Sequence, residues 1–413
     1  MVVALSTSVL FAADWTVFHG PKGDNKSPDT GLLKQWPEGG PTLLWAADFI
    51  GYGYSSVTIS GGRIFTSGNV EREGRYLSMV FCLDMDGNKI WENDNGPAHT
   101  ERVFPGTRGT PTVAGNLVFD VSALGEVACF DAETGIKIWS RNLMQEYEAA
   151  MPRFILGHSL VVDGDNLICM VGSPRTLAVA LNKRTGETVW ESPPAAEERA
   201  TYTSYITPFF FEFEGTRVVV VISNASVEGL DPETGERFFA IPWINTRLVH
   251  CVMPIFHNGY LFLTTGSVGG TAKLFQLTKS ADGMMTASEV WAEPSFNNHH
   301  GGVILVGNYV YGTDYHGAWR SINFMSGEIG YTFRSSIAGK GSVVYADGLL
   351  YGLTENDRTV LLIRPIPNEF VLISSFELPN EVEGRSWAHP VVIGGRLYLR
   401  HAQYLYCFDV RAQ

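Results

Sequence analysis

The ten residues Phe130-Asp131-Ala132-Glu133-Thr134-Gly135-Ile136-Lys137-Ile138-Trp139 (FDAETGIKIW) decide the fold of this chain. They predict the end of one β-strand, a tight turn, and a second strand that ends in Trp139. Asp131 suits such a turn because its side chain accepts hydrogen bonds from nearby backbone N–H groups. Gly135 suits it because glycine tolerates the positive φ that a chain reversal usually needs.

This turn-and-aromatic unit returns along the chain, which indicates a repeat architecture. Each clear copy has an Asp or Asn after an apolar strand, then a turn Gly, then an aromatic residue four positions further on. The copies are residues 83–91, 181–190, 230–239 and 322–331, a degraded one at 277–291, and a last one, 406–409, where the chain runs out.

A second periodic signal is a hairpin made of an apolar strand, a Gly turn and another apolar strand. Its turn glycines are Gly62, Gly115, Gly164, Gly215, Gly259, Gly307, Gly348 and Gly395. Successive glycines lie about 41 to 53 residues apart, which is the spacing of four-stranded propeller blades. The two signals together predict an all-β, eight-bladed β-propeller with four-stranded antiparallel blades.

The ends of the chain complete this prediction. The last blade lacks an outer strand after Asp409, while the strand Pro41–Trp45 precedes the first hairpin without a partner. Pairing the two would close the ring and remove two exposed sheet edges. We therefore expect residues 41–413 to form one propeller, with the Gly/Pro-rich residues 14–40 wrapping its surface as an ordered loop.

Residues 1–13 (MVVALSTSVLFAA) are typical of the apolar core and small-residue end of a truncated secretory signal peptide. The alternative is a short apolar tail that docks on the propeller. The first interpretation predicts an exported protein, either periplasmic or extracellular.

Composition excludes several classes of partner. The net charge is −13 and no run of Lys or Arg occurs, so neither nucleic acid nor an anionic membrane surface is an expected partner. No apolar stretch is long enough to form a transmembrane segment. Helix should be minor, with one turn near residues 144–150 and another near 195–199.

The five cysteines are predicted to be structural thiols. They are Cys82, Cys129, Cys169, Cys251 and Cys407, an odd number without a CxxC pair. Three of them occupy the same repeat position, where other blades carry Ala, Gly, Gln or Ser, so they are expected to be small buried fillers.

The candidate site follows from taking the strand before each hairpin glycine as the innermost one, lining a central channel. The first residues of these strands would then meet at one mouth of the channel. Polar, aromatic or titratable side chains gather in this register: Tyr54, Arg108, His158, His250, His299, His300, Lys340, Trp387 and His389. Such a convergent ring is a usual place for a small-molecule site.

These residue types suggest two kinds of chemistry. Arg binds carboxylates through two parallel hydrogen bonds, aromatic rings stack on sugar faces, and Lys or His donates hydrogen bonds. These properties suit an anionic or polyhydroxylated ligand. A His or Tyr base beside an Arg could also abstract a proton next to a carboxylate. The candidate catalytic residues are therefore His299, His300, His389, Tyr54 and Arg108, and the candidate ligand-binding residues are His158, His250, Lys340, Tyr315, His316 and Trp387. The alternative is that these side chains only form hydrogen bonds between blades, which is the commoner role of a single His at a strand start.

No cofactor is expected. His299 and His300, with His316 returning one hairpin later, form a weak metal signal because no Asp or Glu accompanies them at a fixed spacing. No GxSxG, Walker or HExxH motif occurs. A divalent metal and pyrroloquinoline quinone (PQQ) remain the less favoured alternatives.

The repeats of residues 83–91, 130–139 and 181–190 resemble the tryptophan-docking repeats of the quinoprotein (PQQ-like) eight-bladed propellers. Residues 31–34 with 36–40, and residues 298–303, 339–342 and 389–390, further resemble exported bacterial "PQQ-binding-like repeat" proteins. Members of that group are loosely labelled polyvinyl-alcohol-dehydrogenase-like, or likened to the scaffold lipoprotein of outer-membrane β-barrel assembly. The resemblance implies that each repeat Trp packs between blades and hydrogen-bonds the next turn. Phe239 and Tyr331 depart from this pattern, and residues 365–376 have lost the turn motif.

Three functions are consistent with this resemblance. The first is an exported propeller that binds a small polar ligand such as a carbohydrate or uronate at the central funnel, with processing of that ligand left open. The second is a periplasmic scaffold with a protein partner. The third, a PQQ-dependent dehydrogenase, is disfavoured because neither a vicinal Cys-Cys pair nor a CxxCH haem motif occurs. Whether the protein is an enzyme is left open.

Overall fold

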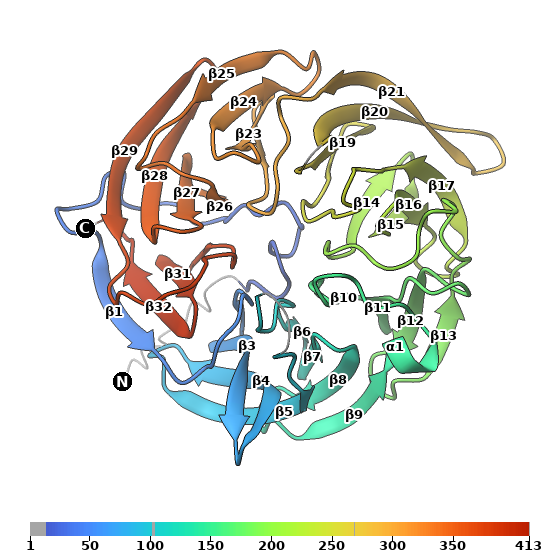
Figure 1. Ribbon diagram of the computed structural model, residues 1–413, viewed down its shortest axis with the longest axis horizontal. Helices are drawn as coiled ribbons and strands as arrows, with labels where there is room; N and C mark the ends of the chain where they lie inside the picture. The colour runs from blue at the N-terminus through green and yellow to red at the C-terminus, as the bar shows by residue number, and fades with distance from the viewer. Residues whose placement is uncertain (1–13, 101–103, 268, 413) are drawn as a thin grey trace, which may run out of the picture.

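The computed structural model describes residues 14–100, 104–267 and 269–412. The predicted signal segment, residues 1–13, lies outside this range. Eight four-stranded antiparallel sheets stand around a central axis like the blades of a propeller (Figure 1). This confirms the predicted fold class, and we number the blades in chain order from the first hairpin.

The strands of each blade follow one another from the axis to the rim. Blade 1 consists of β2 (Thr58–Ser60), β3 (Arg63–Arg72), β4 (Arg75–Asp84) and β5 (Lys89–Pro97), and blade 2 of β6 (Thr112–Ala114), β7 (Leu117–Val121), β8 (Glu126–Asp131) and β9 (Lys137–Asn142). Blade 3 consists of β10 (Val161–Asp163), β11 (Asn166–Met170), β12 (Ala178–Asn182) and β13 (Thr188–Glu191), and blade 4 of β14 (Phe209–Phe213), β15 (Thr216–Ile222), β16 (Ser226–Leu230) and β17 (Arg237–Pro242).

Blades 5 to 8 have the same order. Blade 5 consists of β18 (Ile255–His257), β19 (Tyr260–Thr265), β20 (Thr271–Lys279) and β21 (Met285–Glu293), and blade 6 of β22 (Ile304–Val306), β23 (Tyr309–Thr313), β24 (Trp319–Asn323) and β25 (Ile329–Phe333). Blade 7 consists of β26 (Gly341–Ala346), β27 (Leu349–Thr354), β28 (Thr359–Ile366) and β29 (Glu369–Glu377), and blade 8 of β30 (Val391–Ile393), β31 (Arg396–His401), β32 (Tyr404–Asp409) and β1 (Thr42–Ala47).

The ring closes as predicted, because β1 forms the outer strand of blade 8. It pairs antiparallel with β32, from Thr42 opposite Asp409 to Ala47 opposite Leu405, with one irregularity between Leu43 and Trp45. The first strand of the propeller thus completes the last sheet, and both β1 and β32 have a partner.

Tryptophan docking holds five of the eight blade interfaces. The indole of Trp91 in blade 1 donates to the carbonyl of Ala132 in blade 2 over 3.1 Å. It also covers Gly135, where an added Cβ would meet the ring at 2.5 Å and where φ is +73°. Equivalent indole-to-carbonyl bonds join Trp45 to Met85, Trp139 to Lys183, Trp190 to Pro232 and Trp291 to Phe324. This confirms the packing implied by the resemblance.

Stacked phenylalanines replace docking at two interfaces where the repeat has decayed. Phe211 of blade 4 stacks on Phe256 of blade 5 with ring centroids 3.9 Å apart. Phe333 of blade 6 stacks on Phe370 of blade 7 at 4.3 Å. Because aromatic pairs bury a large apolar area, these contacts can replace the lost indole without its hydrogen bond.

The segment before β1 enters the ring, although the sequence analysis expected it to wrap the surface. Trp15 is buried and exchanges two backbone hydrogen bonds with Ile59 on the inner strand of blade 1. The chain then crosses the interior, where Figure 1 shows it in blue, and Ser27 donates its N–H to Tyr345 on the inner strand of blade 7. The segment thus ties the inner strands of blades 1 and 7 together.

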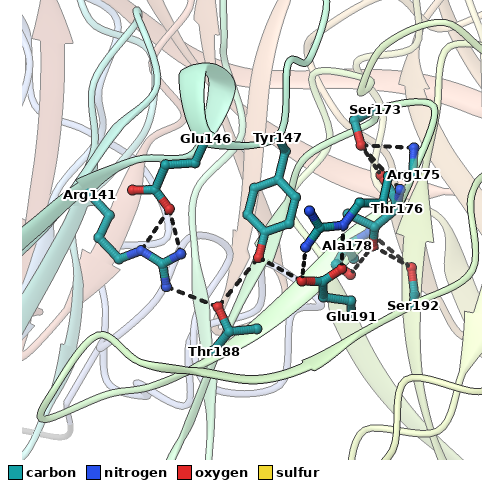
Figure 2. A network of polar contacts seen from close by, with 10 residues as sticks. All are labelled: Arg141, Glu146, Tyr147, Ser173, Arg175, Thr176, Ala178, Thr188, Glu191 and Ser192. Carbon is teal, nitrogen blue, oxygen red and sulfur yellow. Dashed lines mark hydrogen bonds and ion pairs between the residues drawn. The ribbon is translucent and has the colours of Figure 1, made fainter.

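Helix is almost absent from the described residues. The only α-helix there is α1 (Leu143–Glu146), and the expected turn near 195–199 is not helical. Tyr147, just after α1, donates to Glu191 of blade 3, while Arg141 pairs with Glu146 and also bonds Thr188 (Figure 2). Because these polar groups pair with one another at the junction of blades 2 and 3, we assign the network a structural role.

Candidate functional site

An axial cavity of about 330 Å³ lies where the connections between blades approach the axis. Each connection runs from the outer strand of one blade to the inner strand of the next, so its last residues reach the channel mouth. Most of the predicted site residues line this cavity: Tyr54, Arg108, His299, His300, Tyr315, Lys340, Trp387 and His389.

Three predicted ligand-binding residues do not line the cavity. Gly157 and Ser159 line it, but the intervening His158 does not and is buried outside it. Likewise Val249 and Cys251 belong to the lining, whereas His250 is buried outside it. His250 instead bonds Thr265 Oγ1 at 3.0 Å and the Asn224 carbonyl at 3.1 Å.

The prediction that His316 adds a third imidazole to His299 and His300 is also wrong. His316 is exposed and absent from the cavity lining, while its neighbour Tyr315 faces the cavity. No group of three or more His, Cys, Asp or Glu side chains suitable for a metal ion occurs in the described part of the chain.

Both His299 and His300 line the cavity, with ring centroids 4.9 Å apart. They lie in an irregular connection rather than in a strand, so the alternation of side chains along a strand does not separate them. Burial, with the neighbouring charges, lowers the pKa of His299 to about 2, and burial also lowers the pKa of His300. Both imidazoles are therefore neutral at pH 7.

Glu355, which the sequence analysis did not select, is the centre of the charged network. Its Oε2 lies 2.8 Å from Lys340 Nζ, and its Oε1 lies 2.6 Å from Arg385 Nη1. The Trp387 indole donates to the same Oε1 over 2.8 Å, and His300 Nε2 lies 3.4 Å away. Burial alone would raise the pKa of Glu355, but hydrogen bonding with His300 and Lys340 and the positive charge of Lys340 outweigh it and hold that pKa well below its usual range.

Aromatic rings form one wall of the cavity. Trp387 lies 4.6 Å from the ring of Tyr54 and 4.8 Å from that of Phe104, between centroids. The Arg385 guanidinium lies 4.9 Å from the Phe104 ring centroid, so the charged network and the aromatic wall support each other. Such a wall offers flat apolar surface next to charged groups, a combination that suits ring-shaped polar ligands.

Two further cations face the cavity without an acidic partner. Arg108 donates from Nη2 to the Phe104 carbonyl over 2.8 Å, but its buried Nη1 has no hydrogen-bond partner. Arg247 also lines the cavity, and its guanidinium forms no ion pair with any carboxylate of the described ranges. Lys340 and Arg385 share a single carboxylate, so the site carries more positive than negative charge.

His389 connects the cavity to the segment that crosses the ring. Its Nε2 donates to the His300 carbonyl over 2.9 Å, so its Nδ1 accepts from His19 Nε2, also 2.9 Å away. Phe18, beside His19, lines the cavity. Burial lowers the pKa of His389 to about 4 and that of His19 well below its ordinary value, so this pair is neutral at pH 7.

The site residues that the sequence analysis missed lie close to the positions it selected, either upstream in the same connection or at the end of the second strand of a blade. Glu355 directly follows the second strand of blade 7, whose end is at the same mouth as the start of the first strand. Arg247, Arg385 and Phe104 lie a few residues upstream of the positions selected. A search that included the ends of second strands and the whole connection would have found all four.

Buried neutral histidines predict a loss of stability in acid. Burial lowers the pKa of His158 and of His250 to about 4, against roughly 6.5 in an unfolded chain. The unfolded chain therefore binds more protons in this window, so the stability present above pH 6.5 is lost as the pH falls toward 4, by roughly 1.4 kcal/mol per pH unit for each such His.

As the pH falls from 7 to 4, the unfolding free energy of the variant His158→Leu should decrease less than that of the wild type. Neither ring nitrogen of His158 has a hydrogen-bond partner, so an apolar side chain there should cost little at pH 7. The exposed His316→Leu serves as the control. Identical pH profiles for His158→Leu and the wild type would contradict this explanation.

Fold and cavity together define an eight-bladed propeller of PQQ-type repeats with a cationic, aromatic funnel. A family model described as outer membrane protein assembly factor BamB matches residues 37–209 and 125–366. The chain belongs to this family.

Individual relatives agree with that membership. The chain is 24% identical over 294 residues to the outer membrane protein assembly factor BamB of Burkholderia pseudomallei, covering 70% of this chain and 68% of that protein. It is also 24% identical over 152 residues to a quinoprotein ethanol dehydrogenase of Pseudomonas aeruginosa, covering 35% of this chain and only 24% of the dehydrogenase.

Solved structures show the same fold. BamB from Moraxella catarrhalis superposes with a TM-score of 0.59 at 15% identity, covering 90% of this chain and 98% of that one. Quinohemoprotein alcohol dehydrogenase from Comamonas testosteroni superposes with a TM-score of 0.64 at 12% identity, covering 97% of this chain and 81% of that one. No helix among the described residues has the length and apolar character needed to cross a bilayer.

Proposed function

We propose that this protein binds a small anionic ligand in the axial cavity, with an acidic sugar (a uronate) as the favoured class. The observation that carries the proposal is the pair of cavity-facing arginines, Arg108 and Arg247, that have no carboxylate partner in the described ranges. Arg108 is partly buried, and burying a cation without a partner is costly, so a carboxylate ligand would stabilise this site.

The chemistry of the cavity supports a sugar acid over a simple inorganic anion. A guanidinium binds a carboxylate through two parallel hydrogen bonds. The rings of Trp387, Tyr54 and Phe104 offer flat surface for a pyranose face. A net charge of −13 for the whole chain makes this positive cavity a local exception that would attract anions.

The same residues suit an anion better than a divalent metal. Glu355 is the one acidic side chain in the cavity lining, and both of its oxygens are engaged by Lys340, Arg385 and Trp387. A metal ion there would meet two cations at close range. We therefore expect binding to be independent of added metal, and the neutral imidazoles of His299 and His300 to serve as hydrogen-bonding groups.

Arg108→Ala should weaken the binding of glucuronate or galacturonate by roughly 10- to 100-fold, because a hydrogen bond to a charged group is worth about 1.5–3 kcal/mol. Isothermal titration calorimetry of the wild type, Arg108→Ala and a control, Arg217→Ala, would measure this. Arg217 is a surface residue that pairs with Asp163. An equal loss in the control variant, or equal binding of glucose and glucuronate to the wild type, would refute the proposal.

A protein-assembly role is the second candidate, and the family match favours it. A repeated surface feature agrees with it: the residue before each docking Trp points outward and is exposed. These residues are Leu44, Ile90, Ile138, Val189 and Val290. The rim thus presents apolar side chains on outer strands, where an extended segment of a partner could lie. Export to the periplasm would accompany this role.

The assembly role has its own test, which does not involve the cavity. Ile90→Lys and Ile138→Lys together should abolish cross-linking to an unfolded outer-membrane protein in vitro, while uronate binding stays unchanged. Cross-linking that survives both substitutions would count against the rim as the contact surface.

A further inference from the structure

We infer that the cavity holds a ligand with two carboxylates, one at Arg108 and one at Arg247, so the favoured substrate class is a short chain of acidic sugars. This inference rests on the proposed function and specifies how many acidic groups the ligand carries. Two observations support it: the guanidiniums of Arg108 and Arg247 come from connections into different blades, and Arg108 lies deeper in the cavity than Arg247.

The two arginines come from different sides of the funnel. Arg108 lies on the connection that leads into blade 2, and Arg247 on the connection that leads into blade 5. Between them, the connections into blades 3 and 4 contribute Phe154, Tyr205 and Ile206 to the lining, none of which is charged at pH 7. The two guanidiniums thus form two anion subsites separated by a neutral wall.

The remaining charges of the cavity are already balanced in part. Glu355 holds Lys340 and Arg385, and the nearby imidazoles of His299 and His300 are neutral. A ligand with one carboxylate would therefore satisfy one arginine and leave the other without an acidic partner. A ligand with two would match both.

The depths of the two subsites suggest how such a ligand enters. Arg108 is partly buried, with Nη1 sealed from solvent, and packs with its guanidinium 5.5 Å from the Tyr54 ring centroid. Arg247 is exposed at the mouth. A chain with an acidic group on each unit would place its terminal carboxylate at Arg108 and the next one at Arg247. A cavity of about 330 Å³ is at the small end of ligand sites, which favours a disaccharide.

The experiment titrates the full-length protein by calorimetry with galacturonate, digalacturonate, the uncharged disaccharide cellobiose, and PQQ as a planar molecule with several carboxylates. Digalacturonate should bind at least about tenfold more tightly than galacturonate, which corresponds to about 1.4 kcal/mol. Arg247→Ala should weaken digalacturonate binding more than galacturonate binding and so remove that advantage, whereas Arg108→Ala should weaken both acids. Arg217→Ala again serves as the control.

The outcomes separate the two proposals. Equal affinity for galacturonate and digalacturonate, or an Arg247→Ala variant that weakens both acids alike, would overturn the two-carboxylate inference and leave the proposed function standing. Binding of PQQ without binding of digalacturonate would overturn the sugar assignment. If no acid binds the wild type, the proposed function itself fails.

Discussion

Glu355→Gln is expected to lower the free energy of unfolding by about 3–5 kcal/mol, the cost of removing one member of a buried charge network. The side chain of Glu355 is only 3% exposed, and its carboxylate holds Lys340, Arg385 and the Trp387 indole together. Glutamine keeps the size of the side chain but loses the charge and one acceptor oxygen. Urea denaturation at pH 7 would measure the change.

The pH dependence of this effect identifies its origin. The pKa of Glu355 is held below its unfolded value of roughly 4.3, so its contribution is complete above that pH and declines as the pH falls below it. The difference in unfolding free energy between the wild type and Glu355→Gln should therefore be constant from pH 7 to pH 5. It should become smaller in stronger acid. Glu369→Gln, an exposed change in the same blade, is the control and should have little effect. An equal effect of the two substitutions would show that Glu355 is not a structural anchor.

Trp91→Ala should cost a similar amount, about 3–5 kcal/mol, because a large buried side chain is lost and a cavity remains. The substitution removes the indole that covers Gly135 and its hydrogen bond to Ala132, which together join blades 1 and 2. Because each blade packs only on its neighbours, the damage should concentrate at this interface and expose its amides to faster hydrogen exchange.

The adjacent residue provides a matched control for this prediction. Ile90 precedes Trp91 on the same strand and is 45% exposed, so Ile90→Ala should change stability by no more than about 0.5 kcal/mol. If the two variants unfold at the same denaturant concentration, docking is not what holds the interface.

The fold was predictable because its signals are local and repeated. A turn glycine such as Gly135 and the Trp four positions later lie in one short stretch, and the turn recurs often enough to count blades. Closure by β1 followed from an unpaired strand at each end. The path of residues 14–40 was not predictable, because it depends on contacts such as that of His19 with His389, 370 positions away, which no local pattern encodes.

The site was predictable only in part, for a similar reason. The repeat register located the mouth of the channel, but it did not fix which side chain of a connection faces inward. His158 and His250 are buried outside the cavity, whereas the adjacent His299 and His300 both line it. Glu355 belongs to another loop of its blade, and only the three-dimensional arrangement brings it to Lys340 and Arg385.

The pairing of β1 with β32 has a consequence for how the protein is made. The partner of residues 42–47 lies at 404–409, so nearly the whole propeller is translated between the two segments. A growing chain must therefore keep a strand-forming stretch without its partner until the last blade has been made, and only then can the ring close. A chaperone that shields residues 42–47 would have its greatest effect before residues 404–409 have left the ribosome.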